Sequence, residues 1–171
     1  LEKFLAQVPG RIGMAFVVVQ HLDPDHVSAL PELLQRKTHL HVVEVADGMT
    51  VEADRVYVIP PNRDLSLRRG SLFLSVPSAV RGLRLPIDYF FRSLAEDCRH
   101  LAVGVVFSGM GSDGVFGLRA IREKGGLTMV QSPATALADS MPRSAIEAGV
   151  VDIVATVEAM PQHIADYLHH P

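Results

Sequence analysis

LAVGVVFSGMGSDGVFGLRAIREKGG, residues 101–126, reads as a strand, a glycine-rich turn and a helix. Residues 101–107 are apolar and rich in β-branched side chains, which is typical of a strand buried on both faces. The turn that follows, Ser108 to Gly114, contains three glycines and Asp113. Residues 115–124 have the apolar spacing of a helix, and a glycine pair then ends it. Because open α/β sheets place their sites where such turns follow a strand, Asp113 is the first candidate functional residue.

Strands and helices alternate through the rest of the chain as well. Helices are expected over residues 1–8, 28–36, 86–100, 142–149 and 157–168, and strands over residues 14–20, 41–45, 55–59, 127–131 and 150–154. Residues 65–75 alternate in polarity around Arg69-Gly70, which predicts a β-hairpin. No repeat, low-complexity tract or linker divides the chain, so one domain is expected. The predicted class is α/β: a single-domain, doubly wound, mostly parallel sheet with helices on both faces and an antiparallel hairpin.

The composition excludes several classes of protein. Apolar residues make up 48% of the chain and charged residues 20%, a balance typical of globular and not of disordered proteins. The net charge of −3 argues against a nucleic-acid binder, which presents a basic face. The one cysteine, Cys98, rules out an internal disulfide framework and is expected in the core or at an interface. No apolar run is long enough to span a membrane and no signal peptide is recognisable, so a cytoplasmic location is expected.

The glycine-rich turn admits four interpretations. Gly109 to Gly114 matches the G-x-G-x-x-G fingerprint of dinucleotide binding, but the next strand ends without an acidic residue for a ribose, and Asp113 would repel a pyrophosphate. A G-x-S-x-G nucleophile elbow around Ser112 is the second interpretation, although Met110 replaces its first glycine. In the third, Asp113 is the acid that orients a catalytic histidine. In the fourth, it only caps the helix that follows.

His21 is the histidine that would match Asp113. It follows the strand over residues 14–20, so it is expected at the same edge of the sheet. A base and its orienting acid meet in this way from separate strands. The competing interpretation is a metallohydrolase site, because two histidines and two carboxylates fall within six residues: His21, Asp23, Asp25 and His26.

Four separated motifs occur in one order along the chain: Gln20-His21 after a run of valines, Tyr57 to Pro61, Gly109 to Gly114, and Met141 to Ile146. Their order and spacing resemble the chemotaxis receptor methylesterase family of the CheB type, over nearly the whole chain. A fifth segment, Arg84 to Asp88, is most similar to versions fused to a receptor methyltransferase.

The resemblance implies a function and a set of residue roles. The family's enzymes are cytoplasmic serine hydrolases that remove methyl groups from glutamate methyl esters on chemoreceptor helices, and some also deamidate receptor glutamines. His21 resembles the triad base, Asp113 the triad acid, and Met110 lies where the family places a backbone N–H for the oxyanion. Neither a cofactor nor a metal ion is implied. The implied partners are methylated receptor helices, and a receiver or methyltransferase domain of the same polypeptide.

One part of the family pattern is missing from this sequence. The family's nucleophile lies in a G-x-S-x-G turn after a first strand, just before the helix expected here over residues 1–8, and no such motif is present. The expectation is therefore an N-terminally truncated methylesterase-like catalytic domain over residues 1–171, inactive as it stands. The alternative is a non-catalytic domain that docks on receptors or scaffolds.

Overall fold

The computed structural model describes residues 1–21, 29–77 and 84–170. The helices in these ranges are α1 (Glu2–Gln7), α2 (Leu30–Gln35), α3 (Pro86–Cys98), α4 (Val115–Glu123), α5 (Ser140–Glu147) and α6 (Met160–His169). The strands are β1 (Phe16–Val18), β2 (His41–Glu44), β3 (Met49–Thr50), β4 (Arg55–Val58), β5 (Asp64–Arg68), β6 (Ser71–Ser75), β7 (Val103–Val106), β8 (Leu127–Gln131) and β9 (Ile153–Ala155). Within the described ranges, no helix is both long and apolar enough to cross a membrane.

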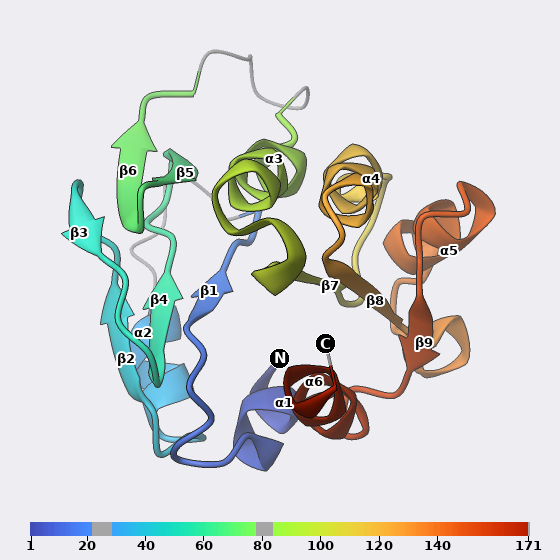
Figure 1. Ribbon diagram of the computed structural model, residues 1–171, viewed down its shortest axis with the longest axis horizontal. Helices are drawn as coiled ribbons and strands as arrows, with labels where there is room; N and C mark the ends of the chain where they lie inside the picture. The colour runs from blue at the N-terminus through green and yellow to red at the C-terminus, as the bar shows by residue number, and fades with distance from the viewer. Residues whose placement is uncertain (22–28, 78–83, 171) are drawn as a thin grey trace.

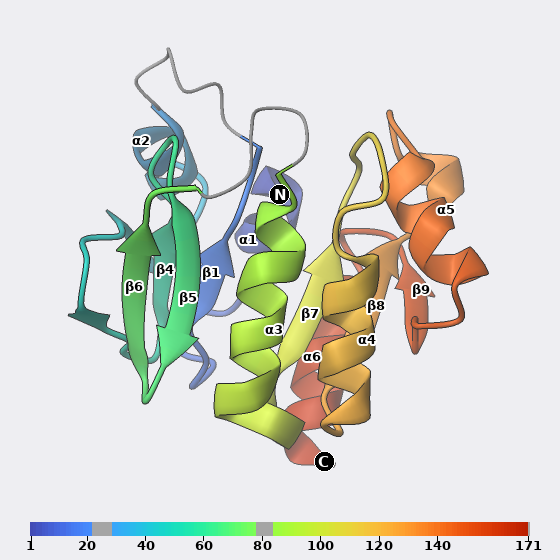
Figure 2. The same cartoon turned by 90° about the horizontal axis from the view of Figure 1, so that it is seen from above.

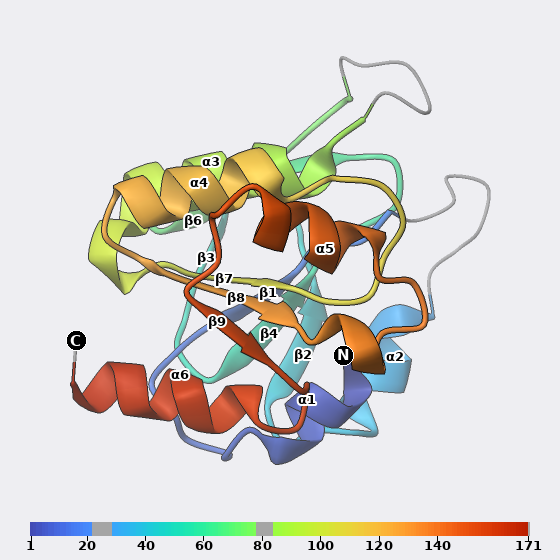
Figure 3. The ribbon, with the colours of Figure 1, turned by 90° about the vertical axis from the view of Figure 1, so that its right-hand side faces the viewer.

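The strands form two parallel sheets and one antiparallel sheet. The parallel sheets have the orders β1-β4-β2 and β7-β8-β9, and the antiparallel sheet has the order β3-β6-β5 (Figure 1). Helices α3, α4 and α5 lie on one face of the parallel sheets, and α1 and α6 lie on the other (Figure 3). The predicted class, a mostly parallel α/β fold with helices on both faces and an antiparallel hairpin, is confirmed.

Some boundaries differ from the predicted ones. Helix α5 begins at Ser140, two residues before the prediction, because Pro142 lies in the first turn, where a missing N–H costs no helical bond. Strand β9 begins at Ile153 and not at residue 150, since the amide of Val150 bonds to the carbonyl of Ala145 and completes the end of α5. Strand β3 was not predicted, because two residues are too few to show alternation.

Two glycines let α3 and α4 pack closely on each other and on β7. A Cβ at Gly117 would lie 2.5 Å from the Cβ of Phe91, and a Cβ at Gly104 would lie 2.6 Å from the Cδ1 of Ile121. Contacts this short are closer than carbon atoms approach in a packed core, so a larger residue at Gly117 would force α3 away from α4, and one at Gly104 would displace the side chain of Ile121. The close packing brings the N-termini of α3 and α4 together at the carboxyl end of β7 (Figure 2).

A cavity of about 730 Å³ lies between the two parallel sheets. Its lining includes residues of β1 and β7, each of which is an edge strand of its sheet, and residues of α3. The lining is mostly apolar and includes Phe16, Phe90, Val105 and Cys98. Burial raises the pKa of the Cys98 thiol, and the charge of the adjacent Asp97 adds to the rise. We call this cavity the β1–β7 slot.

Candidate active site

His21 and Asp113 meet at the carboxyl ends of β1 and β7. The Nε2 atom of His21 lies 2.9 Å from the Oδ2 atom of Asp113. The two side chains differ in exposure, since that of His21 is 49% exposed and that of Asp113 is 3% exposed. An imidazole that a buried carboxylate holds on one nitrogen keeps its other nitrogen for a second partner. The structure therefore joins the two residues that the sequence analysis paired.

Asp113 is held by a helix other than its own. Its Oδ2 accepts a hydrogen bond from the amide of Ile87 (3.0 Å), and its Oδ1 accepts one from the amide of Asp88 (2.9 Å). Both amides belong to the first turn of α3, where backbone N–H groups lack helical partners and favour a negative charge. The alternative interpretation, in which Asp113 only caps α4, the helix that follows it, is wrong, because its carboxylate accepts hydrogen bonds from the first turn of α3.

Asp88 is a residue of this site that the sequence analysis missed. It is 3% exposed, and its Oδ1 accepts hydrogen bonds from the amides of Gly114 (3.0 Å) and Gly117 (2.7 Å) at the start of α4. The signal in the sequence was Pro86 followed by an acidic residue in the first turn of a predicted helix, which marks a helix start. That signal does not show that the carboxylate reaches a second helix.

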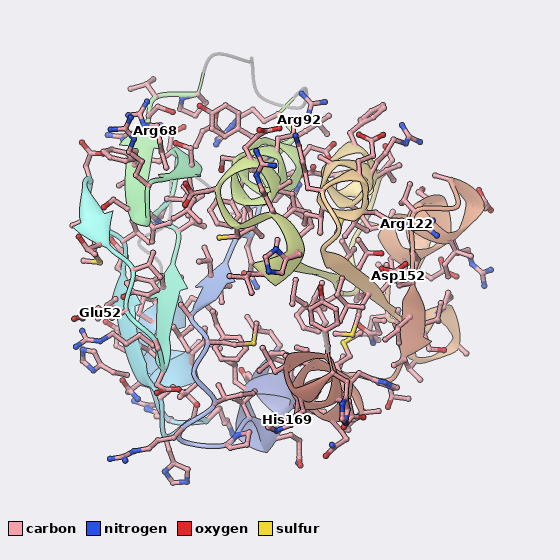
Figure 4. The ribbon with its side chains drawn as sticks, viewed as in Figure 1. Glu52, Arg68, Arg92, Arg122, Asp152 and His169 are labelled. Carbon is pink, nitrogen blue, oxygen red and sulfur yellow. The ribbon has the colours of Figure 1, made fainter. Side chains whose placement is uncertain are left out.

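The surroundings of Asp88 shift its pKa upward. Burial is the largest cause of the raised pKa, and the charge of Asp113 adds to it. The hydrogen bonds from Gly117 and Gly114 act in the opposite direction, as does the charge of Arg92, which lies one turn further along α3 (Figure 4). Two acidic groups therefore share the junction between α3 and α4, and each is held by the amides of the other's helix.

The glycine-rich turn is bound to the loop that leads into α5. The amide of Gly109 donates to the carbonyl of Ala138 (2.9 Å), and the amide of Met141 donates to the carbonyl of Gly109 (3.1 Å). The buried side chain of Gln131, at the end of β8, accepts from the amide of Ser108 (3.0 Å). These bonds fix the turn between two neighbouring loops, so its backbone forms a rigid rim beside the β1–β7 slot.

Met110 lies on this rim. The residue is 76% exposed, and among the described residues no acceptor takes a hydrogen bond from its amide. Met110 and His21 both line the β1–β7 slot. A free amide beside a histidine can stabilise an oxyanion that forms between them, which agrees with the role expected for Met110.

The other interpretations receive no support from the described residues. The carboxylate of Asp113 already accepts two amide bonds and contacts His21, and in this part of the chain Ser112 makes no hydrogen bond to His21. No group of three His, Cys, Asp or Glu residues within the described ranges could hold a metal ion. Three of the four expected metal ligands, Asp23, Asp25 and His26, lie outside those ranges, so the metal hypothesis stays untested.

Comparison with known proteins finds relatives that match most of the chain. The chain is 44% identical over 139 residues to a 104.1 kDa protein of Rhodobacter capsulatus described as uncharacterized; the match covers 81% of this chain and 14% of that protein. It is 33% identical over 180 residues to protein-glutamate methylesterase/protein-glutamine glutaminase 6 of Anaeromyxobacter dehalogenans. That match covers 98% of this chain and 50% of the relative, so the chain spans half of that protein and a smaller part of the first.

The fold is similar to that of a solved structure. The catalytic domain of the CheB methylesterase of Thermotoga maritima superposes with a TM-score of 0.87 at 27% sequence identity. The match covers 96% of this chain and 89% of that domain. The family model for the CheB methylesterase matches residues 1–164. This match spans nearly all of the chain and includes His21, Met110 and Asp113, so the chain belongs to the CheB methylesterase family.

Proposed function

We propose that residues 1–171 belong to the catalytic domain of a serine-type protein-glutamate methylesterase. The observation that carries the proposal is the 2.9 Å contact between His21 and the buried Asp113, whose carboxylate is oriented by two helix amides. This is the arrangement of a general base and its orienting acid. His21 is the base, Asp113 the acid, and the Met110 amide one donor to the oxyanion.

In this proposal, the nucleophilic serine is carried by an additional strand that lies in the β1–β7 slot. Among the described residues, strands β1 and β7 each form hydrogen bonds to a neighbouring strand along one edge only. The carbonyl of Val18 accepts from Ile59, and the carbonyl of Ala102 accepts from Leu127. Because successive residues of a strand point their backbone groups to opposite sides, the groups of Val17 and Val105 point into the slot. The slot thus offers two rows of backbone donors and acceptors, one on each side.

The size of the slot suits one additional strand. A strand of about five residues fills on the order of 800 Å³, for a strand spacing of about 4.8 Å, a layer spacing of about 10 Å and a length of about 17 Å. The cavity measures about 730 Å³. A parallel strand placed there would end between His21 and Met110, where a serine in the following turn would meet the base. We propose that such a strand comes from polypeptide outside residues 1–171.

The mechanism follows from the positions of these groups. The serine hydroxyl attacks the carbonyl of a glutamate methyl ester and gives its proton to His21. Since Nε2 faces Asp113, Nδ1 is the nitrogen that accepts it. The tetrahedral oxyanion accepts a hydrogen bond from the Met110 amide. Collapse expels methoxide, which takes the proton from His21 and leaves as methanol. Water, deprotonated by His21, then attacks the acyl-serine ester, and the serine oxygen leaves with the proton from His21 while the glutamate is released.

The proposed substrate class, cellular location and neighbouring domains rest on the similarity to the relatives. The Anaeromyxobacter dehalogenans protein is named a glutamate methylesterase and a glutamine glutaminase, and the same two activities on chemoreceptor helices are proposed here. Ester and amide hydrolysis share one tetrahedral intermediate, so one site serves both reactions. A cytoplasmic location, and a receiver or methyltransferase domain in the same polypeptide, are parts of the same proposal.

The test measures methanol released from methylated receptor. Residues 1–171 alone are expected to release none, whereas the protein extended to carry the additional strand is expected to be active. In the extended protein Asp113→Asn is expected to lower kcat by about 10⁴-fold, the effect of the corresponding change in a serine protease.

The matched control for Asp113→Asn is Asp97→Asn. Asp97 also accepts two backbone hydrogen bonds, from Arg69 (2.7 Å) and Gly70 (3.1 Å), but it lies at the opposite end of α3. The control is expected to leave kcat unchanged. An unchanged kcat in Asp113→Asn would refute the triad. An extended protein that binds receptor without releasing methanol would support the docking module.

A further inference from the structure

The carboxylates of Asp88 and Asp113 accept hydrogen bonds across the junction between α3 and α4. Asp113 lies just before α4, yet its carboxylate bonds to the amides of Ile87 and Asp88 in α3. Asp88 lies in α3, yet its carboxylate bonds to the amides of Gly114 and Gly117 in α4. Each helix start therefore obtains its capping acceptor from the other helix. We call this set of four hydrogen bonds the reciprocal cap.

We infer that Asp88 is a positioning residue for the candidate active site, and that the reciprocal cap aims the Asp113 carboxylate at His21. The inference rests on the function proposed above. Asp88 makes two hydrogen bonds at this point: its amide donates to the carboxylate of Asp113, and its carboxylate accepts from the amide of Gly114, the next residue along the chain. The side chain of Asp113 and the peptide that follows it are thus both tied to Asp88.

The orientation of Asp113 depends on both of its oxygens. The oxygen that faces His21, Oδ2, also accepts from Ile87, while Oδ1 accepts from Asp88. A rotation of the carboxylate that broke the His21 contact would also break one of these two bonds. The α3 amides therefore select the orientation that serves His21, and the bonds from α4 to Asp88 keep α3 in place to do so.

Asp88 is a costly residue to keep at this junction. Its Oδ2 is buried and has no hydrogen-bond partner among the described residues, and burial raises the pKa of the group. An asparagine would supply the same acceptor to Gly114 and Gly117 without a carboxylate. The pair Asp88→Asn and Asp88→Ala therefore separates the reciprocal cap from the charge, because only the alanine removes the acceptor.

The first test compares kcat and KM for methyl ester hydrolysis in the extended protein. Asp88→Ala is expected to lower kcat about 10²-fold with KM unchanged, the scale of a small misplacement of a catalytic group. Asp88→Asn is expected to keep kcat within a few-fold. Asp97→Ala is the control, because it removes two backbone bonds at the other end of α3 and should reduce stability without reducing kcat.

The second test needs no esterase activity and uses residues 1–171. Amide hydrogen exchange at Ile87 and Asp88 reports the bonds to Asp113 directly. It is expected to accelerate in Asp88→Ala beyond any global change, and to stay slow in Asp88→Asn and Asp97→Ala. An extended wild type without esterase activity would refute the proposed function, while this exchange pattern would still test Asp88.

Two outcomes would overturn the inference. One is an Asp88→Ala protein that keeps the wild-type kcat and exchanges slowly at Ile87 and Asp88, since Asp88 would then be a cap of α4 alone. The other is an Asp88→Asn protein that folds but loses as much kcat as Asp113→Asn, since the charge and not the cap would then matter. The second outcome decides the question even if Asp88→Ala does not fold.

Discussion

Asp88 is a single carboxyl group whose ionisation opposes folding. Its pKa is raised in the folded protein, so the folded state holds the proton more tightly than the unfolded state, where the ordinary value is 3.8. Stability that depends on this group is therefore greatest below pH 3.8, and it declines as the pH rises from there through the raised pKa. The groups that act on it are Asp113, which adds to the rise, and Arg92, which opposes it.

Replacing Asp88 by asparagine should reverse that loss. We expect the free energy of unfolding of Asp88→Asn, relative to the wild type, to be higher at pH 7 than at pH 3, because only the wild type has a carboxyl group at position 88 whose ionisation opposes folding. Urea denaturation at pH steps between 3 and 8 measures the difference. A relative stability that is the same at all pH values, or highest at pH 3, would contradict the raised pKa of Asp88.

Residue patterns in the sequence predicted the pairing of His21 with Asp113 at this junction, but not the role of Asp88. His21 and Asp113 were recognised because each follows a strand, and strands of a parallel sheet end at a common edge. Asp88 was not recognised, because its partners Gly114 and Gly117 lie 26 and 29 residues away and are reached only when two helices pack side by side. Sequence spacing shows where a helix starts, but not which neighbouring amides a carboxylate meets.

At the scale of elements, the strand, turn and helix over residues 101–126 lie close to where they were predicted, as β7 and α4. This unit has strong local signals, namely β-branched residues, a glycine-rich turn and helical spacing. Boundaries that depend on contacts with other elements were less predictable. The start of β9 shifts because Val150 bonds back to α5, and Arg122 of α4 pairs with Asp152 before β9 at 3.3 Å (Figure 4).

The packing of α3 on α4 leads to an element-scale prediction. Gly117→Ala would place a Cβ 2.5 Å from the Cβ of Phe91, so α3 must move away from α4. We expect a loss of about 1–3 kcal/mol in the free energy of unfolding, typical of an overpacked core, reduced in part by the better helix propensity of alanine. Because the shift separates the two halves of the reciprocal cap, amide exchange at Ile87 and Asp88 should accelerate as well.

Thermal and urea unfolding measure the first effect of Gly117→Ala, and hydrogen exchange measures the second. The control is Gly10→Ala, since a Cβ at Gly10 would lie 3.9 Å from the Cβ of His39, an ordinary contact. That variant should change neither quantity by much. A Gly117→Ala protein as stable as the wild type, with slow exchange at Ile87 and Asp88, would show that α3 does not depend on this close approach.

At the scale of the whole molecule, the two parallel sheets lie edge to edge, with the β1–β7 slot between their edge strands. β1 and β7 belong to different sheets, and each is bonded to one neighbour, β4 or β8. The sequence analysis expected a missing strand because the family's G-x-S-x-G turn and the strand before it are absent, whereas the position of the slot between β1 and β7 needed the sheet topology. A strand in that position would join both sheets into one.

Amide exchange can detect this joining residue by residue. The amides of Val17 and Val105 point into the slot, and those of Val18 and Val106 point to β4 and β8. In residues 1–171 alone, we expect Val17 and Val105 to exchange much faster than Val18 and Val106. In the extended protein, Val17 and Val105 should become protected, because the added strand bonds to them.

Val18 and Val106 serve as internal controls and should be protected in both proteins. If Val17 and Val105 still exchange fast in an extended protein that hydrolyses methyl esters, the serine reaches His21 by a route other than a strand in the slot.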